Sequence, residues 1–239
     1  MSKLDGQTVV VLGGSAGMGL ETARLARAEG AEVVITGRNE DRLKQAAGDV
    51  DATGIAAFDA TDPAALTQFF ADFAGPIDHV FITAGGPYYG LLDDLDLADA
   101  QKHIGIELTL PLYVGKAARE KVRGSLTFIG GTGARRPGPG LIVTSAMTNA
   151  QPALIAGLAI EIAPIRVNLI AAGFVDTPLS ARLLGDDLET RRQQLRDTLP
   201  IGRVVGPSDV AALAVHLMTN TALTGATYDI DGGQQFVAR

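Results

Sequence analysis

Glycines at positions 13, 17 and 19 have the spacing of a loop that binds the phosphates of a dinucleotide. An apolar, β-branched run over residues 8–12 precedes Gly13, and a helical pattern opens at Met18. Gly13 would form the tight turn after the strand, Gly17 would let a pyrophosphate approach the backbone, and Gly19 would let the helix pack closely on the strand. The free N–H groups at the helix N-terminus would attract the phosphates. Glycines also end strands for purely structural reasons, and the spacing alone leaves that alternative open.

Arg38 lies just beyond the expected end of the second strand. A carboxylate about 20 residues beyond such glycines usually holds the ribose 2′-hydroxyl of NAD. In this chain Gly37 occupies that position, after an apolar run over residues 31–36, and Arg38 follows it. An arginine can bind a 2′-phosphate through two hydrogen bonds. The pattern therefore favours NADP (NADPH) over NAD, and the alternative is a solvated arginine that opens the next helix.

A regular alternation of strand and helix patterns surrounds these residues and predicts a parallel sheet with helices on both faces. Asn39 and Asp62 are suitable N-caps for two of the helices. Pro111 and Pro152 should bend or interrupt two long helical stretches. The polar segment 174–200 is expected to form a mobile flap or helix over the site. Besides the first strand and helix, strands are expected at 31–36, 55–58, 80–82, 125–129, 166–170 and 227–230, and helices at 39–48, 64–73, 97–123, 142–163 and 209–218.

Composition narrows the possible functions. A chain of 239 residues that is 46% hydrophobic and 20% charged suits one α/β domain over residues 1–239. A net charge of −7 and a pI near 4.9 argue against a nucleic-acid partner. The absence of cysteine excludes disulfides, thiolate metal sites and cysteine nucleophiles, and no metal site is expected. Because no apolar run approaches the roughly 20 residues that span a bilayer, and the start has no apolar targeting core, we expect a cytoplasmic protein without a membrane partner.

Taken together, the motifs of this chain resemble those of the short-chain dehydrogenase/reductase family along nearly the whole length. The resemblance implies an α/β fold, with a single Rossmann-type, doubly wound parallel sheet of about seven strands. It also implies bound NAD(P)(H), a small-molecule substrate and a homotetramer or dimer built partly from the two long helices. The matching segments are Gly13 to Gly19, Asp59, Ala84-Gly85, residues 165–168 with 173–178, 200–203, 207–211, 223–225 and 231–233.

The resemblance also implies which residues hold the dinucleotide. Arg38 would meet the 2′-phosphate, and Asp59 and Ala60 would border the adenine. The residues of the glycine-rich loop would line the pyrophosphate: Gly13, Ser15, Ala16, Gly17, Met18 and Gly19. The adenine ribose and the neighbouring part of the cofactor would lie by Ala84, Gly85 and Gly86, and the nicotinamide by Gly173, Val175 and Thr177.

The chain departs from the family at the residues that move protons. The family uses a serine, a tyrosine and a lysine four residues after the tyrosine, with a helical asparagine in a water relay. Counting back from residues 158–161, which match the family without a gap, the tyrosine falls on Thr144 and the lysine on Thr148. The serine falls on Gly131 and the asparagine on Glu107. The resemblance therefore implies an atypical member that lacks all four groups.

Threonine is a poor substitute for a phenol. Thr144, Thr148 and Thr132 are the candidate catalytic residues at or beside the family positions. Thr144 and Thr132 could donate a hydrogen bond to a substrate oxygen, but a threonine hydroxyl titrates far above a tyrosine. Loss of general acid–base help typically slows a reaction by about 10²–10⁴-fold. We therefore expect slower hydride transfer with cofactor binding intact.

Other side chains could replace the missing acid. Tyr88 and Tyr89 follow the glycines after the fourth strand, where they could supply a phenol or simply cover the cofactor. His103 and Glu107 are four residues apart, so they could share a helix face as a proton pair or belong to a solvated face. His79, before a buried strand, is interpreted as structural.

Two arginines, Arg135 and Arg136, lie in a loop rich in glycine and proline. They could select an anionic substrate, or they could be solvated.

Three hypotheses for the function of the whole chain follow. The protein is an NADP(H)-dependent oxidoreductase acting on a carbonyl or activated double bond, a non-redox enzyme on the same fold, or a catalytically silent NADP-binding protein. The first is favoured, because most members of the family are oxidoreductases.

Overall fold

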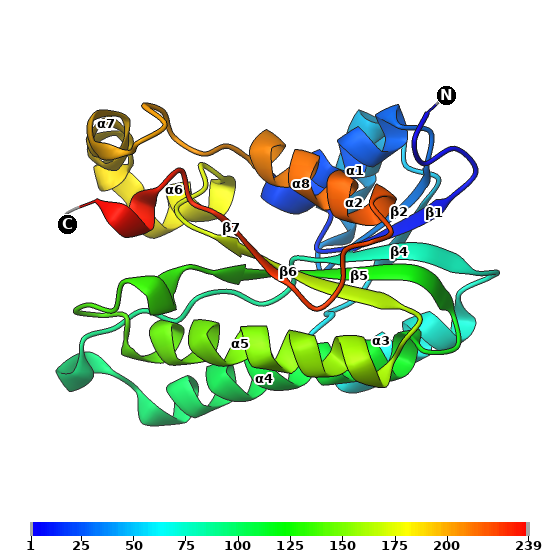
Figure 1. Cartoon of the computed structure of the whole chain (residues 1–239), viewed down its shortest axis with the longest axis horizontal. Coiled ribbons are helices and arrows are strands. Elements are labelled where there is room, and N and C mark those ends of the chain that lie inside the picture. The colour runs from blue at the N-terminus through cyan, green and yellow to red at the C-terminus, as the bar shows by residue number, and fades with distance from the viewer. Residues whose placement is uncertain (1, 238–239) are drawn as a thin grey trace.

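A computed structural model describes residues 2–237 and contains a seven-stranded parallel sheet (Figure 1). The strand order is β3-β2-β1-β4-β5-β6-β7, and every adjacent pair is parallel. This order confirms the predicted doubly wound sheet, whose direction of growth reverses between β1 and β4. The strands are β1 (Thr8–Leu12), β2 (Glu32–Gly37), β3 (Gly54–Ala57), β4 (Ile77–Ile82), β5 (Val122–Gly131), β6 (Arg166–Ala172) and β7 (Thr227–Ile230).

Helices cover both faces of the sheet (Figure 1). One face carries α1 (Gly17–Ala28), α2 (Glu40–Val50) and α8 (Pro207–Thr219). The other carries α3 (Pro63–Asp72), α4 (Leu97–Ala118) and α5 (Ile142–Glu161). Two further helices, α6 (Pro178–Leu184) and α7 (Leu188–Thr198), lie beyond the carboxyl ends of the strands. Short 3₁₀ turns are η1 (Leu92–Asp94), η2 (Gly133–Arg135), η3 (Gly185–Asp187) and η4 (Gln234–Phe236).

The central strand β1 contributes to two separate hydrophobic clusters. Side chains alternate along a strand, so successive residues face opposite sides of the sheet. Val10 and Leu12 pack in the cluster that includes residues of α3, α4 and α5. Val9 and Val11 pack in the cluster that includes residues of α1, α2 and α8. A strand buried on both faces is expected to be apolar throughout, which explains the continuous run over residues 8–12.

Two helix starts follow the sequence predictions. Asn39 Oδ1 accepts a hydrogen bond of 2.8 Å from the backbone N–H of Arg42 and so caps α2. Asp62 Oδ1 accepts one of 2.8 Å from Ala64 N–H at the start of α3, where Pro63 is the first helical residue. Proline suits that position because its missing N–H would have no helical partner there.

The expected interruption of the two long helices is wrong. Neither Pro111 nor Pro152 ends its helix, and α4 and α5 run without a break over Leu97–Ala118 and Ile142–Glu161. Pro111 is buried, and α4 packs against both α3 and α5. Tertiary packing therefore outweighs the one backbone hydrogen bond that each proline removes. The helix α4 ends at Ala118, before the predicted end at residue 123, and β5 begins at Val122.

Arg166, at the start of β6, holds the end of α8. Its guanidinium donates to the carbonyl oxygens of Leu217 at 2.6 Å, Met218 at 2.7 Å, and Asn220 and Leu223 at 3.2 Å. The last carbonyls of a helix have no partner within the helix, so a buried guanidinium is a suitable donor for them.

His79 is structural, in agreement with the sequence interpretation. The ring lies in β4 and is only 5% exposed. Its Nδ1 is 2.8 Å from Ser125 Oγ, and its Nε2 is 2.8 Å from Gln7 Oε1. Burial, helped by the charge of Arg166, lowers the pKa of His79 to about 4.

Within residues 2–237, no helix has both the length and the apolarity needed to cross a membrane.

Candidate functional site

Side chains would not fit at Gly13, in the turn between β1 and α1, or at Gly19, in the first turn of α1. Gly13 has φ +95°, and a Cβ there would collide with Thr83 Oγ1, which donates to the Gly13 carbonyl at 3.1 Å. A Cβ on Gly19 would collide with the same Gly13 carbonyl. Gly17, with φ +55°, is the first residue of α1, one position before the predicted start at Met18.

The N-terminus of α1 has no side-chain cap among the described residues. Its N-cap residue is Ala16, whose methyl group accepts no hydrogen bond. The first N–H groups of a helix need an external acceptor, and together with the helix dipole they favour an anion. Ser15 precedes Ala16, and its hydroxyl lies 3.2 Å from the position of a Cβ on Gly37. The glycine-rich turn and the end of β2 are therefore side by side.

The end of β2 carries a positive charge close to the end of β3. Arg38 is exposed, and its charge lowers the pKa of Asp59. Burial raises the pKa of Asp59, but hydrogen bonds from the N–H and hydroxyl of Thr61, together with Arg38 and Lys102, outweigh it and leave the pKa below its ordinary value. Ala60 is 6% exposed and packs in the core, so its backbone is what it offers to a ligand.

A cavity of about 800 Å³ lies at the carboxyl ends of β4, β5 and β6. In a doubly wound sheet, ligands usually bind outside the carboxyl ends of the strands, near the point where the strand order reverses. Ten of the predicted residues line the cavity: Met18, Ala84, Gly85, Gly86, Thr132, Thr144, Thr148, Gly173, Val175 and Thr177. The others are not part of its lining: Gly13, Ser15, Ala16, Gly17, Gly19, Arg38, Asp59 and Ala60.

The two groups of predicted residues meet at the start of α1. Met18 lines the cavity directly, and the Cβ of Thr177 lies 3.4 Å from the position of a Cβ on Gly17. Thr177 in turn caps α6 by accepting a hydrogen bond from Ser180 N–H at 3.2 Å. The glycine-rich turn therefore opens onto one end of the cavity, as a ligand spanning both regions would require.

Thr144 and Thr148 line the cavity, but their hydroxyl groups are already hydrogen-bonded. Thr144 Oγ1 donates to the Tyr88 carbonyl at 2.8 Å and accepts from the Tyr88 N–H at 3.2 Å. Thr148 Oγ1 donates to the Thr144 carbonyl at 2.8 Å and accepts from Ala134 N–H at 2.9 Å. Their geometry is that of groups that hold loops in place. Thr132 also lines the cavity, and its N–H donates to Ala172 at 3.0 Å, which continues the β5–β6 pairing.

Glycine and threonine fit each other at this wall. The Cγ2 of Thr148 lies 3.2 Å from the position of a Cβ on Gly131. The Cγ2 of Thr144 lies 3.3 Å from the position of a Cβ on Gly133. A side chain on either glycine would therefore make a tight contact with a threonine methyl group, which would have to move by a few tenths of an ångström.

His103 and Glu107 do not form the proton pair considered from the sequence. The His103 ring lies against Tyr88, with ring centroids 4.8 Å apart. Glu107 instead accepts from Gly86 N–H at 2.8 Å and from Gln151 Nε2 at 3.1 Å. Four-residue spacing places two residues on one helix face, but these two side chains contact different segments.

The two phenols take different positions. The Tyr88 hydroxyl donates to the Asp96 carbonyl at 3.2 Å, and Tyr88 is not part of the cavity lining. Partial burial, with the charges of Asp99 and Asp96, raises the pKa of Tyr88. Tyr89 does line the cavity, although the residue is 52% exposed, and burial raises its pKa as well. A raised pKa makes each phenol a weaker acid than usual.

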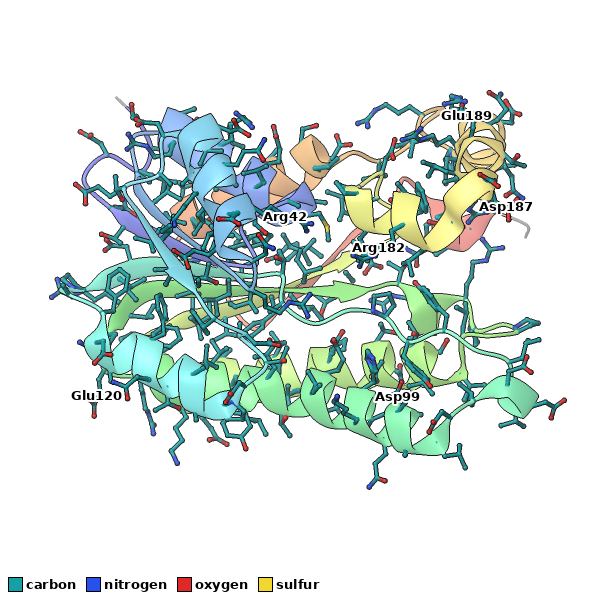
Figure 2. The ribbon with its side chains drawn as sticks, turned by 180° about the vertical axis from the view of Figure 1, so that it is seen from behind. Arg42, Asp99, Glu120, Arg182, Asp187 and Glu189 are labelled. Carbon is teal, nitrogen blue, oxygen red and sulfur yellow. The ribbon has the colours of Figure 1, made fainter. Side chains whose placement is uncertain are left out.

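The polar segment 174–200 forms α6, η3 and α7 along the cavity, so the prediction of helix beside the site is confirmed. Leucines of α6 and α7 line the cavity, while Arg192 and Arg196 form ion pairs with acidic residues of the same segment. Arg192, for example, contacts Asp176 at 2.7 Å. Figure 2 shows other charged residues of this segment, labelled Arg182, Asp187 and Glu189, on the same part of the molecule.

Residues near the end of the chain line the cavity, although none of them was predicted from the sequence as a site residue. Gln234, Gln235 and Val237 all contribute to the lining. Asp231 holds this turn by accepting from the N–H groups of Gly233 at 2.8 Å and Gln235 at 2.9 Å. The one available signal was the motif at 231–233, which resembles the family but carries no chemistry by itself.

Arg135 and Arg136 connect the loop after β5 to this turn. Arg135 donates to both carboxylate oxygens of Asp229, at 2.9 and 3.2 Å. Arg136 donates to the Gln234 carbonyl at 2.7 Å and also lines the cavity. Neither arginine is simply solvated, and Arg135 is paired within the chain instead of facing a substrate.

The described residues contain no cluster of His, Asp or Glu that could hold a metal ion.

Several known proteins are similar to this chain over nearly its whole length. A family model described as enoyl-(acyl carrier protein) reductase matches residues 13–235. An NADP-dependent (R)-specific alcohol dehydrogenase of Lentilactobacillus kefiri is 28% identical over 97% of this chain and 97% of its own. Two solved structures are similar over at least 97% of both chains. They are a reductase/Diels-Alderase, MalC, from Malbranchea aurantiaca (TM-score 0.89, 26% identity) and a small-chain dehydrogenase in complex with NADPH (TM-score 0.82, 27% identity).

Proposed function

The chain belongs to the short-chain dehydrogenase/reductase family, and we propose that it is an NADPH-dependent oxidoreductase that reduces a carbonyl or activated double bond without the family's usual proton donors. One observation carries this proposal. The glycine-rich turn, with its uncapped helix N-terminus, opens through Met18 and Thr177 onto the 800 Å³ cavity. A dinucleotide could lie on the turn with its nicotinamide end in the cavity, beside a substrate.

The residues fit a dinucleotide. Gly13 and Gly19 leave no room for side chains, and the free N–H groups of α1 can receive a pyrophosphate. When bound, the dinucleotide supplies the hydride. The chain's own task is to hold the ring and the substrate together in the cavity and to exclude water from between them. The leucines that α6 and α7 present to the cavity are suited to that task.

The preference for NADPH rests on Arg38 and Ser15. Gly37, which precedes Arg38 and lies beside Ser15, carries no carboxylate that would repel a 2′-phosphate. Arg38 is exposed and can form charge-assisted hydrogen bonds to a phosphate, and the Ser15 hydroxyl lies beside the neighbouring Gly37. The relative that is NADP-dependent by name and the similar structure with NADPH support the same cofactor.

On this proposal, the proton chemistry of the cavity differs from that of typical family members. No tyrosine of the chain has a lysine four residues later. The threonines at the two family positions donate their hydroxyl protons to backbone carbonyls. The proton that accompanies the hydride therefore comes from another group, or the substrate is activated enough to accept hydride first.

The same threonines favour one alternative, a protein that binds NADPH without catalysis. Fluorescence titration with NADPH and NADH, followed by a panel of ketones, aldehydes and enones with NADPH, separates the two. Tighter binding of NADPH and oxidation of NADPH by any member of the panel support the reductase. Binding without turnover across the panel favours the silent protein. Absence of binding to either dinucleotide overturns both.

We also propose that residues 1–239 act as one domain and assemble as a homodimer or homotetramer. Exposed apolar side chains on the two long helices, such as Leu112, Tyr113 and Ile160, support an interface there. Light scattering of the purified protein tests this assembly, and a monomer at micromolar concentration would contradict it. The cytoplasmic location stays a prediction from the sequence.

A further inference from the structure

Few side chains of the cavity can exchange a proton near neutral pH. Among the described residues that line it, Glu107 is the one carboxyl group and Tyr89 is the one phenol. The two arginines of the lining, Arg136 and Arg191, hold their protons too strongly to serve as acids. Burial weakens the phenol further as an acid. The carboxyl group is therefore the best candidate on chemical grounds.

Glu107 is held firmly at the cavity. Its Oε1 accepts from Gly86 N–H at 2.8 Å, and its Oε2 accepts from Gln151 Nε2 at 3.1 Å. A Cβ on Gly85 would collide with the carboxylate, so the glycine there makes room for it. The group is thus fixed between the loop after β4 and helix α5, both of which contribute to the cavity lining.

The environment of Glu107 makes its protonated form more favourable than it is for an exposed glutamate. Burial raises its pKa above the ordinary value of 4.5, and the hydrogen bonds from Gly86 and Gln151 oppose this only in part. These two amides, from the β4 loop and from α5, are the groups that face the carboxylate. The charged groups elsewhere in the lining are Arg136 and Arg191. A carboxyl group whose pKa moves toward neutrality is better suited to general acid catalysis at physiological pH.

Gln151 can support both states of this carboxyl group. The residue is 5% exposed, and its Oε1 has no hydrogen-bond donor among the described residues. While Glu107 is ionised, the Gln151 NH₂ group faces it. After a half-turn of the amide, Oε1 could instead accept the proton of the neutral acid. An acid that must lose and regain a proton in each turnover benefits from a partner that pairs with both forms.

We propose that Glu107, positioned by Gln151 and the Gly86 amide, is the acid–base group of this cavity. This inference rests on the proposed reductase function. As hydride reaches the electrophilic carbon of the substrate, the π electrons of its C=O bond move to oxygen. That oxygen takes the carboxyl proton, the alcohol forms, and Glu107 is left as a carboxylate that solvent protonates again. For an activated double bond, the same proton goes to the carbon or oxygen that receives the electron pair.

The test compares Glu107→Gln with wild type over a range of pH. Glutamine has the same shape and can pair with a turned Gln151, but it has no dissociable proton. We expect kcat/KM for NADPH-dependent reduction to fall by about 10²–10⁴-fold, with the Kd for NADPH within threefold of wild type. In wild type, kcat/KM should fall as pH rises through the pKa of Glu107, and E107Q should lack this dependence. Glu107→Asp should retain part of the activity.

A matched control and a second readout complete the experiment. Glu120 lies exposed at the end of the molecule opposite α6 and α7 (Figure 2), so Glu120→Gln should behave as wild type. Gln151→Leu should shift the pH at which kcat/KM falls, but the fall itself should remain, because Gln151 positions the acid and does not donate the proton. The second readout is stability. A carboxyl group whose pKa is raised by folding stabilises the folded protein at low pH, and this contribution is lost as pH rises from its unfolded-state pKa through its folded-state pKa. The melting temperature of E107Q should therefore rise relative to that of wild type over this pH interval.

The possible results are distinguishable. Reduction by E107Q at the wild-type rate and with the wild-type pH profile overturns the role of Glu107 and leaves the proposed function intact. A melting-temperature difference between E107Q and wild type that does not change with pH also contradicts it. A wild-type protein that binds NADPH but reduces nothing overturns the reductase function and this inference with it.

Discussion

Thr144 and Tyr88 are joined by two hydrogen bonds. The threonine hydroxyl donates to the Tyr88 carbonyl at 2.8 Å and accepts from the Tyr88 N–H at 3.2 Å. The family resemblance predicts the tyrosine position at Thr144, and in this chain Thr144 fastens the loop after β4 to the first turn of α5. The residue is 7% exposed, so water cannot readily replace the threonine.

Thr144→Val should therefore act on stability more than on chemistry. It removes the hydroxyl and leaves the N–H and carbonyl of Tyr88 without a partner, at a cost of about 1–3 kcal/mol in the free energy of unfolding. Urea denaturation measures this loss, and Thr144→Ser, which keeps the hydroxyl, is the matched control. We expect kcat/KM to fall less than about tenfold. A fall of more than a hundredfold with unchanged stability would mean that Thr144 acts on the substrate directly.

Arg38→Ala should weaken the binding of NADPH and leave NADH almost unaffected. A charge-assisted contact to the 2′-phosphate is worth about 10- to 100-fold in affinity, and NADH has no phosphate there. Fluorescence titration with both dinucleotides measures the change. Arg42→Ala is the control, because Arg42 is also exposed but lies in the first turn of α2 (Figure 2). Equal weakening of NADPH and NADH would contradict the assignment of Arg38.

His79 should make the protein less stable in acid. Its pKa is about 4 in the folded chain and near 6.5 when unfolded, so the unfolded state binds more protons between these values. Stability is then fully present above pH 6.5 and falls as pH drops toward 4, by about 3 kcal/mol for this group. Urea denaturation at pH 7 and pH 4 should show a smaller loss for His79→Gln than for wild type. An equal loss in both proteins would exclude His79 as the cause.

Arg166→Leu should reduce stability severely. It leaves four carbonyl oxygens, two in the last turn of α8 and two just after it, without their donor. A buried acceptor that loses its partner costs about 1–3 kcal/mol, so we expect a total of about 3 kcal/mol or more. Denaturant unfolding measures it, with Arg166→Lys as an intermediate case that keeps the charge but fewer donors. Variant protein that is folded at low temperature should bind NADPH as wild type does, since Arg166 is not part of the cavity lining.

The fold could be predicted because it depends on local spacing. The apolar strands, the glycines at 13, 17 and 19, and the caps at Asn39 and Asp62 are each visible within a few residues of sequence. Their physical consequences are local as well: a turn, a helix start, a buried strand. The interruption expected at Pro111 and Pro152 is wrong because the packing of α4 and α5 on their neighbours is not a local property.

The site was harder to predict, because its contacts join distant parts of the chain. Glu107 pairs with Gln151, and Arg136 with the Gln234 carbonyl, across 44 and 98 residues. Nothing in the sequence near Glu107 distinguishes Gln151 from any other helical glutamine. His103 and Glu107 share a spacing that suggested a pair, but the spacing did not show that Tyr88 and Gly86 would each attract one of them.

The turn held by Asp231 has a practical consequence for anyone who handles this protein. Because Gln234, Gln235 and Val237 form part of the cavity wall, peptide sequences fused after them would lie next to the cavity. Purification tags and fluorescent reporters are better attached before residue 2, since the N-terminus emerges at the other end of the molecule from α6 and α7 (Figure 1).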